Sequence, residues 1–455
     1  MSKSVPTWDQ VIETRTCSLS GQQFSITDLD QYLYEKIGPR FGDQHFSVPF
    51  PDLSPDMRYM NRLSWRNERN FHSRKCSISG QPIISIYDED VPFPVLDQDV
   101  WWSDEWNTYD YGQQVDFDRP FFDQFMELYV KVPQIALNAP FSENSKYCNQ
   151  AQRLKDCYIV FCSDLTVKSL YCMWNNNCDR NVDCSYANTS QNCYECLNID
   201  RCNSCFYSDD LINCSDISYS KSLTGCQQCF GCCNLTNKKF HIFNEEYSQE
   251  EYVKKVEQLK KEPHVREKVD TFVYNQIHKF YHGFYTERSS GDYIRNVKKA
   301  FNCFNCRDAE VLRHSQDAHE QRYCIDMTEV LLQDFCIHIE GCYKNSNSGF
   351  SMKVNESSDI WYSSHIYWSE HTLGSVWVKS GKNILLNMSY SENEYQALAA
   401  KLVAHMVNTW EFGKHFPIKD SPFPYNETTA HEYFPMTKSQ ALNFGFRWKD
   451  EEKIS

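Results

Sequence analysis

The chain has 455 residues, enough for about three domains of average size. Its 61 Asp and Glu residues outnumber its 46 Lys and Arg residues, and the net charge of -15 argues against binding of a nucleic-acid backbone, which needs cations. No apolar run approaches the roughly 18 residues of a membrane span, and the first residues lack the apolar stretch of a secretory signal. We therefore expect an intracellular protein, cytoplasmic or part of a virion, without a membrane partner.

The N-terminal region contains a short duplication around its two cysteines. Cys17 begins the run CSLSGQ and Cys76 begins the run CSISGQ. The shared pattern C-x-x-S-G is similar to the C-x-x-C-G knuckle of a zinc ribbon that has lost its second thiolate. Residues 1–140 are therefore predicted to form a degenerate ribbon-like module that is rich in aromatic residues.

Aromatic residues are concentrated between Trp101 and Phe125. A helix is predicted to begin near Pro120, with Asp118 as its N-cap. One face of this helix would carry Phe121, Phe122, Phe125, Leu128 and Tyr129. The favoured interpretation is a small aromatic core between the module and the next domain. The alternative is a sugar- or peptide-binding surface with exposed Trp rings.

Cysteines then recur with a period of 21 along the chain. The two series that show it are Cys172, Cys193 and Cys214, and Cys184, Cys205 and Cys226. A repeat this short suits one turn of a parallel β-solenoid, with three short strands and three bends per turn. We expect these thiols to be buried, free and stacked in columns along a narrow core.

CxxC pairs within this region suggest metal or redox chemistry as an alternative. Two such pairs are Cys193/Cys196 and Cys202/Cys205. Their separation is shorter than that of zinc ribbons, and Ile217 and Leu223 occupy the positions one period after Cys196 and Cys202. Metal ligands would not be expected to alternate with Ile and Leu, so core packing is the favoured interpretation.

A larger duplication relates the segment at about 143–262 to the segment at about 289–408. EEYSQEEY from Glu245 matches MSYSENEY from Met388, and Ser248 and Ser391 each begin a capping box. The offset between the copies is 146 at Tyr147 and Tyr293 but 143 at the capping boxes. We expect an amphipathic helix to close each copy, and a third helix around Val265–Phe280 to link them.

These patterns predict a mainly β protein with two tandem parallel β-solenoids of 21-residue coils and capping helices, preceded by the degenerate zinc-ribbon-like module. The expected domains are the module at 1–140, a first solenoid with its helix at 141–262, a linker helix at 263–288, a second solenoid with its helix at 289–408, and a C-terminal tail at 409–455 that packs back.

Several longer motifs resemble those of a family of cysteine-rich proteins from small-genome bacteria and large viruses, which carry two zinc-ribbon-like segments followed by duplicated repeat segments. The matching runs are WRNER (Trp65–Arg69), WWSDEW (Trp101–Trp106), Tyr109–Phe125, ENSKY (Glu143–Tyr147), Ile242–Tyr252, SGDY (Ser290–Tyr293) and Ser421–Lys438. The resemblance brings no activity with it. Ser20, Ser54, Met57, Ser79 and Val100 stand where the family pattern implies zinc ligands. We therefore expect no bound zinc.

No nucleotide-binding, zinc-protease or hydrolase motif occurs in the chain. We accordingly assign no catalytic, cofactor-binding or metal residue and no cofactor, and an enzyme is not the favoured class. The favoured function is a structural or interaction scaffold that binds a protein partner, such as a virion or assembly component. The alternatives are a carbohydrate-binding or carbohydrate-cleaving solenoid, and a metal or redox protein that uses the Cys columns.

Overall fold

The computed structural model describes residues 6, 9–315, 318–326, 330–337 and 340–450. The chain is mainly β, and a β-solenoid of about 17 turns runs between residues 158 and 385. The N-terminal elements are β1 (Val11–Thr16), β2 (Gln23–Thr27), α1 (Asp28–Lys36), β3 (Arg40–Phe41), β4 (Gln44–His45), α2 (Pro55–Leu63), β5 (His72–Lys75), β6 (Pro82–Ser85), β7 (Val95–Leu96), α3 (Gln98–Trp102), η1 (Thr108–Tyr111), α4 (Phe121–Lys131) and β8 (Gln134–Ile135).

The solenoid strands belong to two separate sheets. Residues 143–244, here called arm 1, contain β9 (Tyr158–Phe161), β10 (Leu170–Met173), β11 (Ser185–Asn188), β12 (Tyr194–Asp200), β13 (Asn203–Ile212), β14 (Ser215–Ser218), β15 (Lys221–Thr224), β16 (Gln227–Phe230) and β17 (Lys239–Ile242). The chain continues through β18 (Glu245–Glu246), α5 (Gln249–Leu259) and α6 (Val265–Tyr274).

Residues 283–387, here called arm 2, contain β19 (Gly283–Glu287), β20 (Gly291–Asp292), β21 (Ile294–Phe301), β22 (Cys303–Phe304), β23 (Arg307–Arg313), β24 (Ala318–Ile325), β25 (Val330–Ile337), β26 (Glu340–Gly349), β27 (Met352–Asn355), β28 (Ser358–Trp361), β29 (Ser364–Tyr367), β30 (Ser369–Leu373) and β31 (Gly381–Leu385). After arm 2 come β32 (Met388–Ser389), α7 (Glu392–Asn408), η2 (Ile418–Asp420), η3 (Tyr425–Glu427), α8 (Thr429–Tyr433) and α9 (Lys438–Asn443).

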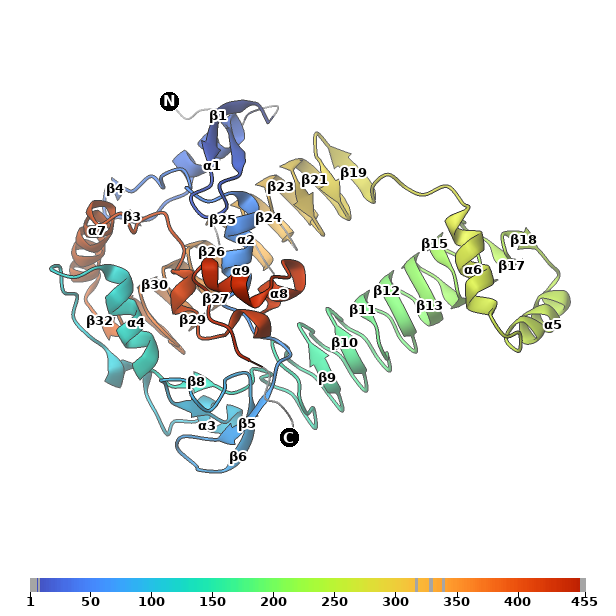
Figure 1. Cartoon of the computed structure of the whole chain (residues 1–455), viewed down its shortest axis with the longest axis horizontal. Coiled ribbons are helices and arrows are strands. Elements are labelled where there is room, and N and C mark those ends of the chain that lie inside the picture. Colours follow the sequence, from blue (N-terminus) through green and yellow to red (C-terminus); the bar gives the residue numbers. More distant parts are fainter. Residues whose placement is uncertain (1–5, 7–8, 316–317, 327–329, 338–339, 451–455) are drawn as a thin grey trace.

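Arm 1 leads away from the N-terminal elements toward α5 and α6, and arm 2 returns from there (Figure 1). The arms therefore run in opposite directions. The N-terminal elements and the C-terminal segment gather at the same end of the molecule, around the later turns of arm 2.

The turn length predicted from the Cys spacing is wrong. Residues that stack on adjacent turns are 12 positions apart, as Ser163 and Asn175 are, and the parallel partners Tyr158 with Leu170 and Leu211 with Leu223 keep the same separation. The Cys series of the sequence mixed steps of 12 and 9, which are both multiples of three. Cys172 therefore stacks above Cys184 and not above Cys193, so the predicted columns are also wrong.

A three-residue unit explains these spacings. Every third residue from Phe141 to Phe243 has a positive φ, near the value of a left-handed helix. Each such residue turns the chain, so a turn made of four triplets has four sides. Asn and Asp are frequent at these corners, since their short polar side chains tolerate this conformation best after Gly. In arm 2 the same positive φ recurs from Tyr293 to Trp377 among the described residues, and again at Asn383 and Leu386.

One residue of each triplet points into the core, and the four sides stack these residues in four columns. The columns of arm 1 are Cys148, Val160, Cys172, Cys184, Cys196, Ser208, Ser220 and Cys232; Ala151, Ser163, Asn175, Ala187, Ile199, Leu211 and Leu223; Leu154, Thr166, Cys178, Ser190, Cys202, Cys214 and Cys226; and Cys157, Ser169, Asn181, Cys193, Cys205, Ile217 and Cys229. All of them are buried. The six thiols singled out in the sequence are free and buried, as expected.

The backbone N–H group of each inward residue is buried and needs a hydrogen-bond acceptor. The other two N–H groups of each triplet donate to carbonyls of the neighbouring turns, as those of Asp209 and Asn213 do. Where the inward residue one turn earlier has a polar side chain, the N–H of the inward residue donates to it: Asn175 to Ser163 Oγ at 3.0 Å, and Cys202 to Ser190 Oγ at 3.1 Å. Small side chains with an O or S acceptor satisfy a buried donor that would otherwise be costly.

Both arms end in the same way. Asn244 accepts from the N–H of Cys233 and donates to its carbonyl, each at 2.9 Å. Asn387 makes the equivalent pair with Val376, at 2.8 and 2.9 Å. The predicted capping boxes at Ser248 and Ser391 are present and begin α5 and α7.

Two details of the predicted helices are wrong. The linker helix α6 ends at Tyr274, and Phe280 is fully exposed beyond it. Asp118 does not cap α4; the carboxylate of Glu411 accepts from the N–H groups of Phe121 and Phe122, at 2.9 and 2.7 Å. Glu411 is 290 positions from Phe121 in the chain, so no local pattern could reveal this cap.

A buried ionic network fixes the N-terminal elements to arm 2. Arg313 of β23 donates to Asp30 of α1 at 2.6 Å, and Arg58 of α2 pairs with Asp326. All four side chains are buried. Removal of one partner from such a network is expected to be strongly destabilising, because it leaves a buried charge unpaired.

The stability of the columns provides a first prediction. Cys178 accepts from the N–H of Ser190, and burial raises the pKa of Cys178 to about 12, so the thiol stays neutral. Cys178→Ser keeps an acceptor and should change the free energy of unfolding little. Cys178→Ala removes it and should cost about 1–2 kcal/mol, and Cys178→Asp more. Chemical denaturation measures these differences; equal stability of the Ser and Ala variants would contradict the role of the acceptor.

Candidate functional site

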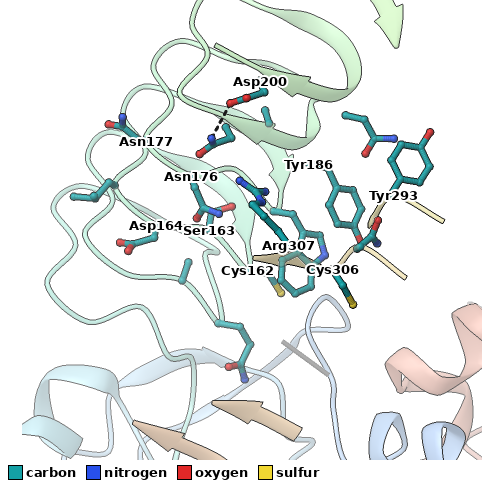
Figure 2. Close-up of a pocket in the computed structure, with 18 of the residues that line it drawn as sticks. Cys162, Ser163, Asp164, Asn176, Asn177, Tyr186, Asp200, Tyr293, Cys306 and Arg307 are labelled. Atoms are coloured by element: carbon teal, nitrogen blue, oxygen red, sulfur yellow. Dashed lines mark hydrogen bonds between the residues drawn. The ribbon is translucent and has the colours of Figure 1, made fainter. Parts of the chain in front are cut away.

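A cavity of about 1060 Å³ lies between the two arms. Its walls come from one face of arm 1 and one face of arm 2. Its base comes from the N-terminal elements, including Trp65, Arg66 and Asn67 of the WRNER run. We call this cavity the inter-arm cleft. Figure 2 shows Asp164, Asn176 and Asn177 on its arm 1 wall, and Arg307 and Tyr293 approaching from arm 2.

The arm 1 wall is built from two ladders of outward side chains that flank one inward column. The ladders are Gln150, Cys162, Trp174, Tyr186, Asn198, Asp210 and Ser222, and Gln152, Asp164, Asn176, Asn188, Asp200, Ile212 and Thr224. Residues of one ladder lie one turn apart, a spacing of about 4.8 Å. Asn188 donates to Asp200 at 2.9 Å along its ladder. This wall therefore presents mostly amides, hydroxyls and carboxylates.

Contacts between the arms join the two walls of the cleft at two places. Toward α6, the Tyr293 hydroxyl donates to Asp210 at 2.8 Å, and Arg295 lies 3.9 Å from Asp200. At the base, Lys353 donates to Gln150. The two hydrogen-bonded pairs are 83 and 203 positions apart in the sequence. The cleft is thus a product of how the arms meet.

Two ring pairs line the cleft. Trp174 and Tyr186 stack with centroids 5.7 Å apart and planes 6° from parallel. His282 and Tyr293 stack at 4.2 Å. Burial, followed by the neighbouring Asp210 carboxylate, raises the pKa of Tyr293, which therefore stays a hydrogen-bond donor. A flat ring surface beside polar groups suits ligands with both an apolar face and hydroxyls.

The charge of the cleft is opposite to that of the whole chain. Its basic residues are Arg66, Arg201, Lys279, Arg295, Arg307 and Lys353, and its acidic residues are Asp164, Asp200 and Asp210. Asp200 is shared between Arg201 at 3.0 Å and Arg295 at 3.9 Å. The cleft therefore has a cationic excess in a protein of net charge -15.

The aromatic stretch predicted as a possible ligand surface is mostly core. Trp101 is fully buried, and its ring lies 4.5 Å from that of Trp377 of arm 2. Its indole N–H donates to the carbonyl of Pro133 at 3.1 Å. The exposed platform expected as the alternative is therefore absent at Trp101. The outward ladders of the cleft were not predicted, because they follow the 12-residue turn and not the 21-residue spacing of one Cys series.

The two N-terminal Cys runs form the turns of two antiparallel hairpins, β1–β2 and β5–β6. The N–H of Gly21 bonds the carbonyl of Cys17, and that of Gly80 bonds the carbonyl of Cys76, each at 2.9 Å. Burial alone would raise the pKa of Cys17, but hydrogen bonds from Ser20, Ser54 and Leu19 lower it to about 7. The origin of these hairpins from zinc ribbons stays a prediction.

Within the part of the chain that the structure describes, no three His, Cys, Asp or Glu side chains group as metal ligands do. The cysteines of the columns are free thiols, and Cys336 and Cys342 have side chains outside the described set. No described helix is long and apolar enough to cross a membrane. Partial burial, followed by the neighbouring Arg313, lowers the pKa of His314 well below the usual value.

Comparison of the sequence with protein-family models finds no match, and comparison with curated proteins finds none. The resemblance to cysteine-rich bacterial and viral proteins is therefore still a prediction.

The contact between Tyr293 and Asp210 can be tested by removal of one hydroxyl. Tyr293→Phe should lower the free energy of unfolding by about 1 kcal/mol and speed hydrogen exchange in β20 and β21. Tyr285→Phe is the control, since Tyr285 is 77% exposed on the neighbouring strand β19. Equal effects of the two substitutions would show that the hydroxyl does not hold the arms together.

The expected absence of zinc is also testable. Because Ser20, Ser54, Met57, Ser79 and Val100 replace the implied ligands, native mass spectrometry of protein expressed with zinc in the medium should show the mass of the chain alone. About one tightly held zinc per chain would contradict the prediction.

Proposed function

We propose that the protein is a non-enzymatic interaction scaffold whose two arms form a preformed binding cleft for an elongated polar ligand. The observation that carries the proposal is that hydrogen bonds join the two walls of the inter-arm cleft at two places along it. Arms built on continuous hydrogen-bond ladders are rigid, so the cleft is organised before a ligand arrives. Preorganisation reduces the entropy lost on binding.

The carboxylates of the cleft support binding over catalysis. Asp164 pairs with Arg153, Asp200 pairs with Arg201, and Asp210 accepts from Tyr293. A general acid or base needs a carboxyl group within hydrogen-bond reach of the substrate, so that it can donate or accept a proton. Here each carboxylate is engaged in holding another side chain in place.

The proposal includes that the two arms are copies of one ancestral solenoid. Its support is the repeated ending, in which Asn244 and Asn387 make the same pair of bonds before equivalent capping boxes. Pairing two copies in opposite directions gives a cleft with two walls of similar construction.

Carbohydrate binding is the form of this function that the wall chemistry favours. The Trp174–Tyr186 pair lies beside ladders of amides and carboxylates. Aromatic faces stack on the apolar face of a sugar, and amides and carboxylates bond its hydroxyls. A peptide would use the apolar part of the lining, such as Ile212 and Phe284, for its anchoring side chains, and is therefore the competing class of ligand in the test.

The test is a binding panel of neutral oligosaccharides, acidic oligosaccharides, peptides and short oligonucleotides, measured by calorimetry. Trp174→Ala should weaken binding of any cleft ligand by about tenfold or more. Tyr171→Ala is the control, since Tyr171 is exposed on the same arm outside the cleft. A ligand that binds both variants equally, or a panel without any ligand, would contradict the proposal.

A further inference from the structure

The strongest feature of the inter-arm cleft that its proposed function leaves unexplained is a pair of stacked arginines. Arg295 of β21 and Arg307 of β23 are register partners on adjacent turns of arm 2, and both line the cleft. Like charges directly opposite each other on neighbouring strands are destabilising. A folded protein retains such a pair at a cost, which an anionic ligand would offset.

The nearby carboxylates do not neutralise this pair. Asp200 lies 3.9 Å from Arg295 but is also bonded to Arg201 at 3.0 Å. Asp308, next to Arg307 in the chain, accepts instead from Asn296 at 2.7 Å. Among the described residues, Arg307 has no carboxylate within ion-pair distance. Its guanidinium, partly buried, is thus directed into the cleft without a counter-charge.

The groups around Arg307 indicate the remainder of the ligand. The Tyr186 ring and the amide of Asn176 come from arm 1. Asn305, which also lines the cleft, is the preceding corner of arm 2. These are neutral groups that bond hydroxyls, beside a ring that can stack. One rung of the ladder, about 4.8 Å, is similar in length to one sugar ring.

We propose that the inter-arm cleft binds an acidic oligosaccharide, with Arg307 and Arg295 holding a uronate carboxylate while the amide ladders and the Trp174–Tyr186 pair hold its rings. This inference rests on the proposed function of the cleft. An arginine fork matches a carboxylate in a bidentate geometry, which gives orientation as well as affinity.

Nucleic acid fits the cleft less well. Phosphates follow one another along a strand and require cations along its whole path. Here the cations are spaced apart: Arg201 and Lys279 lie toward the α6 end, Arg307 lies beside Asn176 and Tyr186, and Arg66 and Lys353 lie near the base. Between them the ladders present amides, hydroxyls and the carboxylates of Asp164, Asp200 and Asp210, which would repel successive phosphates. Such a lining suits a saccharide with few acid groups in contact.

The test compares hexagalacturonate with its fully methyl-esterified form, using calorimetry on the full chain. The two probes differ only in the charge of their carboxyl groups. The wild-type protein should bind the acid at least about tenfold more tightly than the ester, and added salt should weaken binding of the acid alone. Equal affinity for the two probes would overturn the anionic specificity and leave the cleft as a neutral saccharide site.

Variants then assign the effect to the arginine pair. Arg307→Gln should weaken binding of the acid by about tenfold and leave binding of the ester within about twofold. Arg307→Lys keeps the charge without the fork and should fall between the wild type and Arg307→Gln. Arg180→Gln is the matched control, because Arg180 lies on arm 1 outside the cleft and pairs with Asp179.

Three results would overturn the inference. Loss of binding in Arg180→Gln equal to that in Arg307→Gln would show a non-specific charge effect. Tighter binding of a thymidine hexanucleotide than of hexagalacturonate would assign the cleft to nucleic acid. Failure of both galacturonate probes to bind would exclude uronates as ligands. The other ligands of the binding panel would then decide whether the proposed function is correct.

Discussion

The solenoid depends on one constraint: each triplet of its backbone directs one N–H group into the core, where no carbonyl of the ladder can meet it. Where the side chain stacked one turn earlier carries an acceptor, it accepts this bond, as Ser163 does for Asn175. The core is therefore narrow and also polar at regular intervals. Cys, Ser and Asn fill it because they combine small volume with an acceptor, and Ile, Leu and Val occur between them. This requirement gives the abundance of cysteine a structural cause without metal or redox chemistry.

The sequence was sufficient to predict a mainly β chain with a parallel solenoid, its buried free thiols and both capping boxes. It failed on the turn length, because cysteine is only one of several residues allowed at an inward position. Cys172 and Cys193 are separated by seven triplets, and the intervening inward positions are held by other residues such as Asn175 and Asn181. The spacing of one residue type is therefore a multiple of three residues, but it need not equal the number of residues in a turn.

The inter-arm cleft could not have been predicted at all. It requires Gln150 to lie beside Lys353 and Asp210 beside Tyr293, and these pairs are set by the angle at which the arms meet. The same is true of Glu411, which caps α4 from the far end of the chain. Local patterns define which face of a turn a residue occupies, but contacts between distant faces depend on the packing of whole arms against the N-terminal elements.

The triplet construction also determines how such a chain can change through insertion and deletion. The offset between the two arms becomes shorter by one triplet along their length, which is one side of the four-sided turn. Loss of a triplet keeps the inward residues inward, yet it moves every later outward residue by a quarter turn around the arm. Deletion of three codons would therefore turn all later outward faces in a new direction and leave the core intact. A single deletion of this kind could change which ladder of side chains lines the cleft.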